Sequence, residues 1–273
     1  MGTHASAWRL RGARILLTGA SEGIGRALAL ELARQGARFA LAARDATRLE
    51  SAAQACRALD AEAHALPADL TDPQACDTLV AAAAQRLGGL DVLVNNAGAT
   101  MWARFDALAD LEVFERLLRL NLLAPVRLTH AALPWLLQSR GLVVGVASVA
   151  GLTGVPERTA YAASKHALVG FLESLRIELA PRGIDVCIVA PDFVRSETHR
   201  RATGADGRPL GASPLEGARI MSAEDCARFA ALAIRRRERL AIASWRGRLG
   251  YRLKPWMPRL LDAIAARAIR ERR

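Results

Sequence analysis

The sequence predicts an α/β fold in which one doubly wound parallel sheet is covered by helices on both faces. Short apolar strands alternate with amphipathic helical segments along the chain, a pattern typical of such sheets. A glycine-rich turn joins the first strand to the first helix. The chain has 273 residues, of which 52% are hydrophobic, so it can bury a large core without a long disordered segment.

The first strand is expected at residues 14–17 and runs into the glycine turn at 18–25, Thr-Gly-Ala-Ser-Glu-Gly-Ile-Gly. A helix follows and ends near Gly36. Glycines permit a tight turn, and the free amides at the helix N-terminus attract a pyrophosphate. Such turns also serve packing alone, but the strand before this one and the helix after it favour nucleotide binding.

The second strand, expected at 39–43, ends in Ala43-Arg44-Asp45. In a parallel sheet of this kind, that strand end lies beside the adenosine ribose of a bound dinucleotide. An acidic residue there favours NAD, whereas an arginine suits the 2′-phosphate of NADP. Arg44 therefore favours NADP, and Asp45 keeps NAD open. The alternative is a solvated pair of opposite charges at a helix start.

Five more strands complete the predicted sheet, at 62–66, 91–94, 142–147, 184–190 and 240–243. Helices are expected between them at 72–87, at 108–138 with interruptions at Pro125 and Pro134, at 159–180 and from Ser222 onward. Polar or small residues follow several strands, and ligands bind at the carboxyl ends of strands in open α/β sheets. These residues are Asp69-Leu70, Asn95-Asn96-Ala97-Gly98, Ser148 and Pro191-Asp192.

Tyr161 and Lys165 lie four residues apart on a predicted helix, so one face presents both side chains. The ammonium favours the phenolate, which suits the phenol to general acid or base catalysis. The chain has two tyrosines and two lysines, so random placement gives roughly 0.015 such pairs. The alternative is a surface helix with a solvated lysine.

The chain resembles the classical short-chain dehydrogenase/reductase family over about residues 10–243, because its motifs occur in the order that is typical of that family. The matching pieces are Thr18–Gly25, Asn95–Gly98, Asn121, Ser148 and Tyr161-Ala-Ala-Ser-Lys165. The resemblance implies a Rossmann-type sheet of about seven strands, a nicotinamide cofactor and a homodimer or homotetramer. It also implies hydride transfer between the cofactor and a carbonyl or secondary alcohol, with no metal ion.

The resemblance also implies individual roles. Tyr161 protonates the substrate oxygen, Lys165 holds the nicotinamide ribose, Ser148 hydrogen-bonds the substrate oxygen, and Asn121 positions a water. The implied cofactor contacts are Gly19, Ser21, Glu22, Gly23, Ile24, Gly25, Arg44, Asp69, Leu70, Asn95, Ala97, Gly98, Tyr161, Lys165, Pro191, Val194 and Ser196. One departure is Asp192, where the family usually has a glycine that lets the backbone approach the nicotinamide.

One dinucleotide-binding catalytic domain is expected at residues 1–250, with a substrate lid inside it, and an extension is expected after it. Residues 193–218 are polar and rich in glycine and proline, and we expect a lid over the site. Residues 251–273 form a basic C-terminal extension with one apolar helical face: Leu253, Trp256, Met257, Leu260, Leu261, Ile264 and Ala268. This helix either lies on an anionic membrane or docks on its own or a neighbouring subunit.

Charge and composition narrow the function. Of the net charge of +11, residues 235–273 carry most, with twelve arginines, one lysine and three acidic residues. This tail has no nucleic-acid-binding motif, so no nucleic-acid partner is expected. The scattered cysteines and the absence of a signal peptide in residues 1–12 favour a cytoplasmic protein, with peripheral membrane contact left open.

The predicted function is NAD(P)-dependent oxidation or reduction of a small molecule, with NADP favoured and a hydrophobic or lipid-like substrate. Reduction of a 3-oxoacyl thioester is the alternative within the same chemistry. An alternative of another class is a cofactor-binding regulator or membrane-surface adaptor without turnover.

Overall fold

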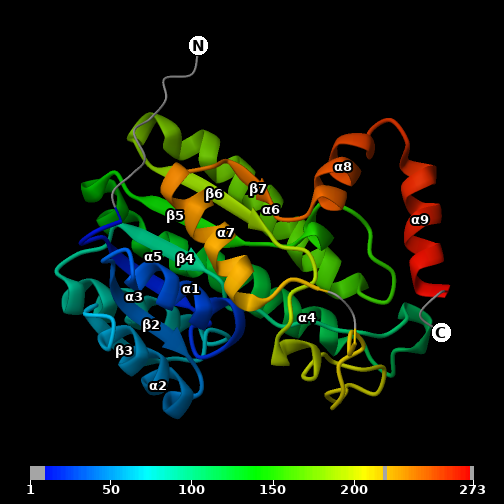
Figure 1. Cartoon of the computed structure of the whole chain (residues 1–273), viewed down its shortest axis with the longest axis horizontal. Helices are drawn as coiled ribbons and strands as arrows, with labels where there is room; N and C mark the ends of the chain where they lie inside the picture. The colour runs from blue at the N-terminus through cyan, green and yellow to red at the C-terminus, as the bar shows by residue number, and fades with distance from the viewer. Residues whose placement is uncertain (1–9, 218–219, 271–273) are drawn as a thin grey trace.

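A computed structural model describes residues 10–217 and 220–270 of the chain. It contains a seven-stranded, fully parallel sheet in the order β3-β2-β1-β4-β5-β6-β7 (Figure 1). The strands are β1 (Arg14–Thr18), β2 (Arg38–Ala43), β3 (Ala63–Pro67), β4 (Val92–Asn95), β5 (Leu142–Val146), β6 (Asp185–Ala190) and β7 (Leu240–Ile242). The strand order reverses direction between β1 and β4. The predicted fold class is confirmed.

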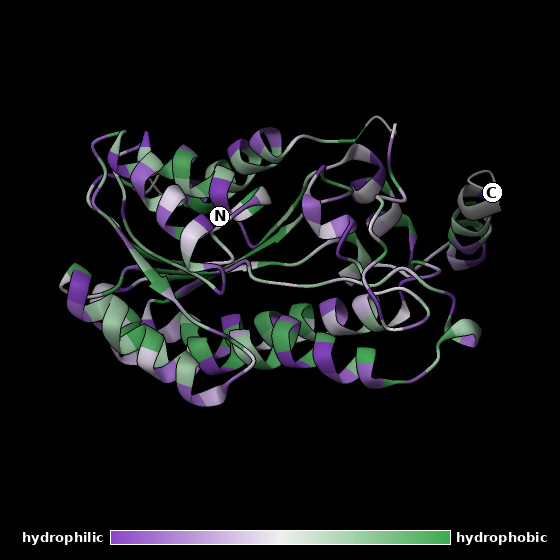
Figure 2. Ribbon diagram, turned by 90° about the horizontal axis from the view of Figure 1, so that it is seen from below, coloured by the Kyte–Doolittle hydropathy of each residue, from purple (hydrophilic) through white to green (hydrophobic). Residues whose placement is uncertain are grey.

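Helices cover both faces of the sheet, as the edge-on view in Figure 2 shows. One face packs against α1 (Gly23–Ala33), α2 (Ala46–Arg57) and α7 (Ala223–Arg236); the other packs against α3 (Pro73–Leu87), α5 (Ala124–Ser139) and α6 (Thr159–Leu179). Side chains along β1 point alternately to the two faces of the sheet. Ile15 and Leu17 pack on the side of α1, α2 and α7, and Leu16 packs on the side of α3, α5 and α6. Burying one leucine or isoleucine side chain fully stabilises the folded chain by roughly 1.5–3 kcal/mol relative to leaving it exposed.

Side-chain caps define where several helices begin. Asp72 accepts a hydrogen bond from the amide of Gln74 and precedes Pro73, the first residue of α3, while Ser222 accepts one from the amide of Asp225 at the start of α7. Both helix starts agree with the sequence prediction. At the other end of α3, Gly88 ends the helix with φ +74°, a left-handed conformation that favours glycine.

The segment predicted as one interrupted helix at 108–138 differs in detail. Helix α4 (Glu112–Leu118) continues into a π-helical turn, Arg119–Leu123, and then into α5. Pro125 is the second residue of α5 and directly follows the π-helical turn, so the helical run continues through it as well. The predicted break at Pro134 is wrong, because α5 runs through it. Pro134 and His130 are both exposed, so water can solvate the carbonyl that the proline leaves without a donor.

The C-terminal region forms two helices rather than the one expected. Helix α8 (Trp245–Leu253) was not predicted and contains the expected domain boundary at residue 250, and α9 (Pro258–Arg270) begins at its proline. Figures 1 and 2 show α9 standing away from the body. Residues 271–273 of the predicted extension, 218 of the predicted lid and 1–9 of the predicted N-terminal segment lie outside the described residues. Within the described ranges, every helix is too short or too polar to cross a bilayer.

Candidate active site

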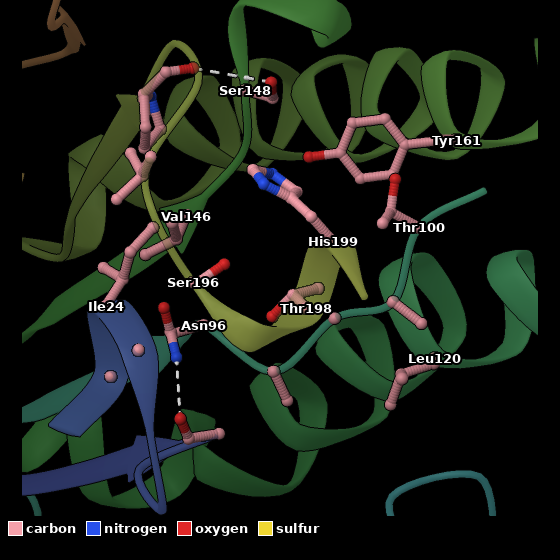
Figure 3. Close-up of a pocket in the computed structure, with 18 of the residues that line it drawn as sticks. Ile24, Asn96, Thr100, Leu120, Val146, Ser148, Tyr161, Ser196, Thr198 and His199 are labelled. Carbon is pink, nitrogen blue, oxygen red and sulfur yellow. Dashed lines mark hydrogen bonds between the residues drawn. The ribbon is translucent and has the colours of Figure 1, made fainter. Parts of the chain in front are cut away.

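A cavity of about 750 Å³ opens at the carboxyl ends of the strands, where the strand order reverses. Its walls come from the glycine turn, the ends of β4, β5 and β6, the start of α6 and residues 193–201 (Figure 3). Most of the predicted site residues line this cavity: Gly19, Ser21, Glu22, Gly23, Ile24, Gly25, Arg44, Leu70, Ala97, Gly98, Ser148, Tyr161, Lys165, Pro191, Val194 and Ser196.

The glycine turn leaves a cradle that larger residues would fill. A Cβ on Gly25 would lie 2.1 Å from the carbonyl oxygen of Gly19, and Gly19 itself has φ +66°. Asn96, which was not predicted as a site residue, ties the turn to β4 because its Nδ2 donates to the carbonyls of Thr18 (2.9 Å) and Gly19 (3.2 Å). Helix α1 has no side-chain cap, so its first amides remain available to a phosphate. These features fit a dinucleotide.

At the expected adenosine end, the acidic side chains already have basic or amide partners. Asp45 caps α2 through the amide of Arg48, at 2.9 Å, and Glu22 forms ion pairs with Arg48 (3.0 Å) and with Arg201. Arg44 is exposed at the cavity edge. Arg201 comes from the predicted lid, so its ion pair with Glu22 joins that segment to the glycine turn.

Asp69 lies outside the cavity lining, although Leu70 contributes to it. The Asp69 carboxylate accepts hydrogen bonds from the amide (3.0 Å) and hydroxyl (2.8 Å) of Thr71. Its pKa is lowered chiefly by the amide of Thr71, with the Thr71 hydroxyl and the charge of Arg44 adding to the effect against desolvation. The aspartate therefore shapes the turn after β3.

The side chains of Ser148, Tyr161 and Lys165 meet in the inner part of the cavity. Ser148 follows β5, and its hydroxyl accepts from the amide of Ala150 at 3.1 Å. Figure 3 shows the Tyr161 hydroxyl directed toward the side of the cavity that carries Ser148. Lys165 Nζ donates to the carbonyl oxygen of Val146 at 2.9 Å and lies 5.9 Å from the centroid of the Tyr161 ring. One loop and one helix thus place two hydroxyls and an ammonium together.

Burial sets the electrostatics of Lys165, whose side chain is almost fully enclosed. Desolvation lowers the pKa of Lys165; the nearby Tyr161 acts in the opposite direction, and the positive charge of Arg158 adds to the lowering. A phenol, a hydroxyl donor and a buried amine in this arrangement can exchange a proton with a bound carbonyl or alcohol oxygen.

Asn121 lies behind the cavity wall rather than in it. It sits in the π-helical turn, where its Oδ1 accepts from the amide of Ala99 at 2.9 Å. Its Nδ2 donates to the carbonyl of Ala99 (3.0 Å) and to the hydroxyl of Ser164 (2.9 Å). A Cβ on Gly98 would lie 3.1 Å from Asn121 Oδ1 and 3.6 Å from Lys165 Nζ. Asn121 therefore joins the loop after β4 to α6 beside Lys165.

Asn95 is also buried outside the cavity lining. Its Nδ2 donates to the hydroxyl of Thr129 at 3.3 Å, while its Oδ1 has no hydrogen-bond partner within the described ranges. Asn95 and Asn121 thus hold the framework around the cavity, and their neighbours Asn96 and Leu120 line it.

Two basic residues in the cavity lining were not predicted. Arg158 is 6% exposed; its guanidinium lies 4.3 Å from the centroid of the Tyr161 ring and 5.2 Å from that of Trp102. His199 lies on the predicted lid, and burial lowers its pKa from 6.5 to about 4, with the charge of Arg158 acting in the same direction. No motif or spacing in the sequence marks either residue, because both reach the site through tertiary contacts.

The unusual Asp192 is engaged by its neighbours. One carboxylate oxygen accepts from the amide of Phe193 at 2.9 Å, and the other accepts from the hydroxyl of Ser244 at 2.7 Å. The hydroxyl of Ser244 in turn accepts from the amide of Gly247 and caps α8. Asp192 thus connects the cavity wall to the C-terminal helices.

The family model described as short chain dehydrogenase matches residues 13–206 of this chain. The chain belongs to the short-chain dehydrogenase family. The parallel sheet with helices on both faces, described above, agrees with this membership.

Curated relatives of this short-chain dehydrogenase include 11-beta-hydroxysteroid dehydrogenase-like 4A from Arabidopsis thaliana, 38% identical over 189 residues. That match covers 69% of this chain and 63% of the relative, so the chain spans less than two thirds of its length. 11-beta-hydroxysteroid dehydrogenase 1A from the same plant is 34% identical over 260 residues. That match covers 93% of this chain and 74% of the relative. Dehydrogenase/reductase SDR family member 7B from Bos taurus is 36% identical over 210 residues, a match that covers 74% of this chain and 64% of the relative.

Two solved short-chain dehydrogenases have the same fold. One from Burkholderia cenocepacia J2315, in complex with NADP, is 34% identical with a TM-score of 0.74, covering 86% of this chain and 96% of that one. One from Burkholderia phymatum, in complex with NAD, is 23% identical with a TM-score of 0.80, and the match covers 93% of this chain and 96% of that one. The second likeness concerns the fold alone.

Proposed function

We propose that this short-chain dehydrogenase transfers hydride between NADP(H) and the carbonyl or secondary alcohol of a hydrophobic or lipid-like small molecule. The supporting observation is that Ser148, Tyr161 and Lys165 line the same cavity as a glycine cradle suited to a dinucleotide. The three side chains support the type of reaction. The charges at the adenosine end support the cofactor preference, and the outer part of the cavity supports the class of substrate.

In the direction of reduction, Tyr161 donates its hydroxyl proton to the substrate oxygen, and Ser148 donates a hydrogen bond to the same oxygen. The positive charge of Lys165 lowers the cost of the phenolate that remains. Lys165 also holds the cofactor's ribose, and Asn121 positions a water on the side of Lys165. The bound cofactor supplies the hydride. Oxidation of an alcohol uses the same groups in reverse, with the phenolate as base.

NADP is favoured by the charges at the adenosine end. Arg44 lies exposed at the cavity edge and offers a charge-assisted contact to a 2′-phosphate. The acids that would instead bind the ribose hydroxyls of NAD have other partners: Asp45 caps α2, and Glu22 pairs with Arg48 and Arg201. The remaining proposed contacts, including Asp69 and Asn95, act through the backbone turns that they hold.

An apolar substrate is supported by the outer part of the cavity, which includes Leu120, Val155 and Phe193. Phe193 and His199 belong to the predicted lid over residues 193–218, and their rings are in contact, with centroids 6.5 Å apart. The low pKa of His199 makes it a neutral hydrogen-bonding group near neutral pH. Movement of this segment would admit the substrate and then exclude water.

We further propose a homodimer or homotetramer in the cytoplasm, assembled through α4, α5 and α6. The support is that α6 carries the largely exposed Ile177, in addition to the face that it buries against the sheet. Light scattering on the eluted protein measures the assembly, and a monomeric Ile177→Arg variant is the expected result. An unchanged mass for that variant would contradict the assignment of this helix to the interface.

The test of function uses the two tyrosines of the chain as a matched pair. Tyr161→Phe is expected to lower kcat with NADPH by 10²–10⁴, the range for a lost general acid, with little change in NADPH affinity measured by fluorescence titration. Tyr251→Phe, on α8, keeps wild-type turnover. A screen of ketones, 3-oxoacyl thioesters, sterols and sugars identifies the substrate. Equal turnover by both variants, or no turnover by the wild type with any of these, would contradict the proposal.

A further inference from the structure

Helices α8 and α9 carry an apolar surface that no other described part of the chain covers. We call it the C-terminal apolar patch; its members are Trp245, Leu249, Tyr251, Trp256, Met257, Leu260 and Ile264. Trp256 is 84% exposed and Ile264 is 56% exposed. Since Figures 1 and 2 both show α9 apart from the sheet, the body does not provide the missing cover. Large apolar side chains exposed together on neighbouring segments mark an interaction site.

Basic side chains surround this patch. Residues 245–270 contain seven basic residues and one acidic residue, Asp262. Exposed basic side chains lie on α8, between the helices and on α9: Arg246, Arg248, Arg252, Lys254, Arg259 and Arg267. Tryptophan and tyrosine place a ring in apolar surroundings and a polar group in water, which suits the headgroup level of a bilayer. The combination is characteristic of helices that lie in an anionic membrane surface.

A second copy of the chain fits this surface less well. A two-fold interface brings the same patch of each subunit together, so it would place these basic residues against their own copies. Like charges across an interface oppose binding. Outside residues 235–273 the chain is almost neutral, so the rest of a second copy carries no net negative charge to attract this basic region. An anionic leaflet offers both apolar depth and negative charge.

Helix α8, which carries part of the patch, is also attached to the wall of the cavity. Asp192 lines the cavity and accepts a hydrogen bond from Ser244, which caps α8. Lys254, between α8 and α9, donates to the carbonyl of Leu152 at 2.8 Å, in the segment between β5 and α6. A Cβ on Gly247 would lie 2.9 Å from a methyl carbon of the cavity residue Val149, so α8 packs closely there.

We propose that the C-terminal apolar patch docks this protein on the surface of an anionic lipid membrane. The apolar side chains enter the headgroup region, the basic side chains remain level with the lipid phosphates, and the contacts of α8 hold the cavity wall beside the bilayer. The contact is peripheral and reversible, because it depends on a short helix pair and on charges that salt screens.

Flotation of the purified full chain with vesicles tests the proposal without any need for turnover. We expect binding to phosphatidylcholine vesicles that contain about one third phosphatidylserine, weaker binding to pure phosphatidylcholine, and release at high salt. Arg252→Gln/Arg259→Gln is expected to lower the partition coefficient roughly 25-fold, from about fivefold for each basic residue near an anionic surface. Arg86→Gln/Arg116→Gln removes equal charge from exposed sites outside the patch and retains binding.

A second pair of variants separates apolar insertion from charge. Trp256→Ser/Ile264→Ser is expected to lower vesicle binding at least tenfold, whereas Phe105→Ser/Leu111→Ser, at exposed sites elsewhere, leaves it unchanged. Circular dichroism and NADPH binding confirm that each variant is folded. The proposal is overturned if the wild type does not float, if patch and control variants float equally, or if the patch variants dissociate an oligomer in light scattering while vesicles bind none of the proteins.

Discussion

Replacing His199 by phenylalanine tests whether burial keeps this side chain neutral in the folded enzyme. The histidine is 8% exposed and lies against Phe193, with Arg158 near enough to oppose a second positive charge. Phenylalanine preserves an aromatic ring at the site but cannot bind a proton. Any pH dependence of stability that His199 contributes should therefore disappear in the variant.

The magnitude follows from the two pKa values. Burial, helped by the charge of Arg158, lowers the pKa of His199 from 6.5 to about 4 in the folded chain. The unfolded chain therefore takes up a proton at higher pH, so the stabilising contribution is complete above pH 6.5 and is lost as the pH falls toward 4. At about 1.36 kcal/mol for each pKa unit, the full effect is about 3 kcal/mol, and about 2 kcal/mol of it is lost between about pH 7 and pH 5.

Urea unfolding, followed by circular dichroism across this pH range, measures the effect. The free energy of unfolding of the wild type should fall by about 2 kcal/mol more than that of His199→Phe. His130→Phe, at an exposed position on α5, serves as the control and should follow the wild type. Parallel pH profiles for the wild type and His199→Phe would refute the reasoning, as would a wild type that gains stability relative to the variant on acidification.

Three further substitutions probe the cofactor end and the connection to α8. Arg44→Ala should raise the KM for NADPH about 10- to 100-fold and leave that for NADH nearly unchanged, because a charge-assisted contact contributes about 1.5–3 kcal/mol; equal effects on both cofactors would contradict this role. Gly25→Ala should lower NADPH affinity at least tenfold and reduce Tm, since its Cβ would lie 2.1 Å from the Gly19 oxygen; wild-type affinity would show that the turn adapts. Asp192→Ala removes the acceptor of the Ser244 hydroxyl and should speed hydrogen exchange over residues 245–253; unchanged exchange would mean that α8 does not depend on this bond.

The proposed catalytic side chains were predictable because their signals are short-range. Tyr161 and Lys165 share a helix face at a spacing that a reader of the sequence can count, and Ser148 follows a strand that is apolar throughout. The structure places all three in one cavity with the glycine turn. The parallel sheet and the helical layers likewise follow from the alternation of strands and helices along the chain, since each element hides one face or both.

Other positions depended on contacts that no local pattern records. Arg158 and His199 reach the Tyr161 side of the cavity from a helix start and a loop, and Asp192 turns to a serine that lies 52 residues away. Pro134 shows the opposite error, since a residue that usually ends a helix is tolerated where its neighbouring carbonyl faces water.

The sequence alone therefore determined the parallel sheet and pointed to the glycine turn and the type of reaction that we propose, because two- and 3.6-residue periodicities and short motifs carry that information. Only the tertiary structure decided which side chains surround the cavity and that Asn121 stands behind its wall. It also decided that the amphipathic C-terminal segment leaves its apolar face uncovered. Amphipathicity shows that a helix has an apolar face; what covers that face depends on where distant parts of the chain pack.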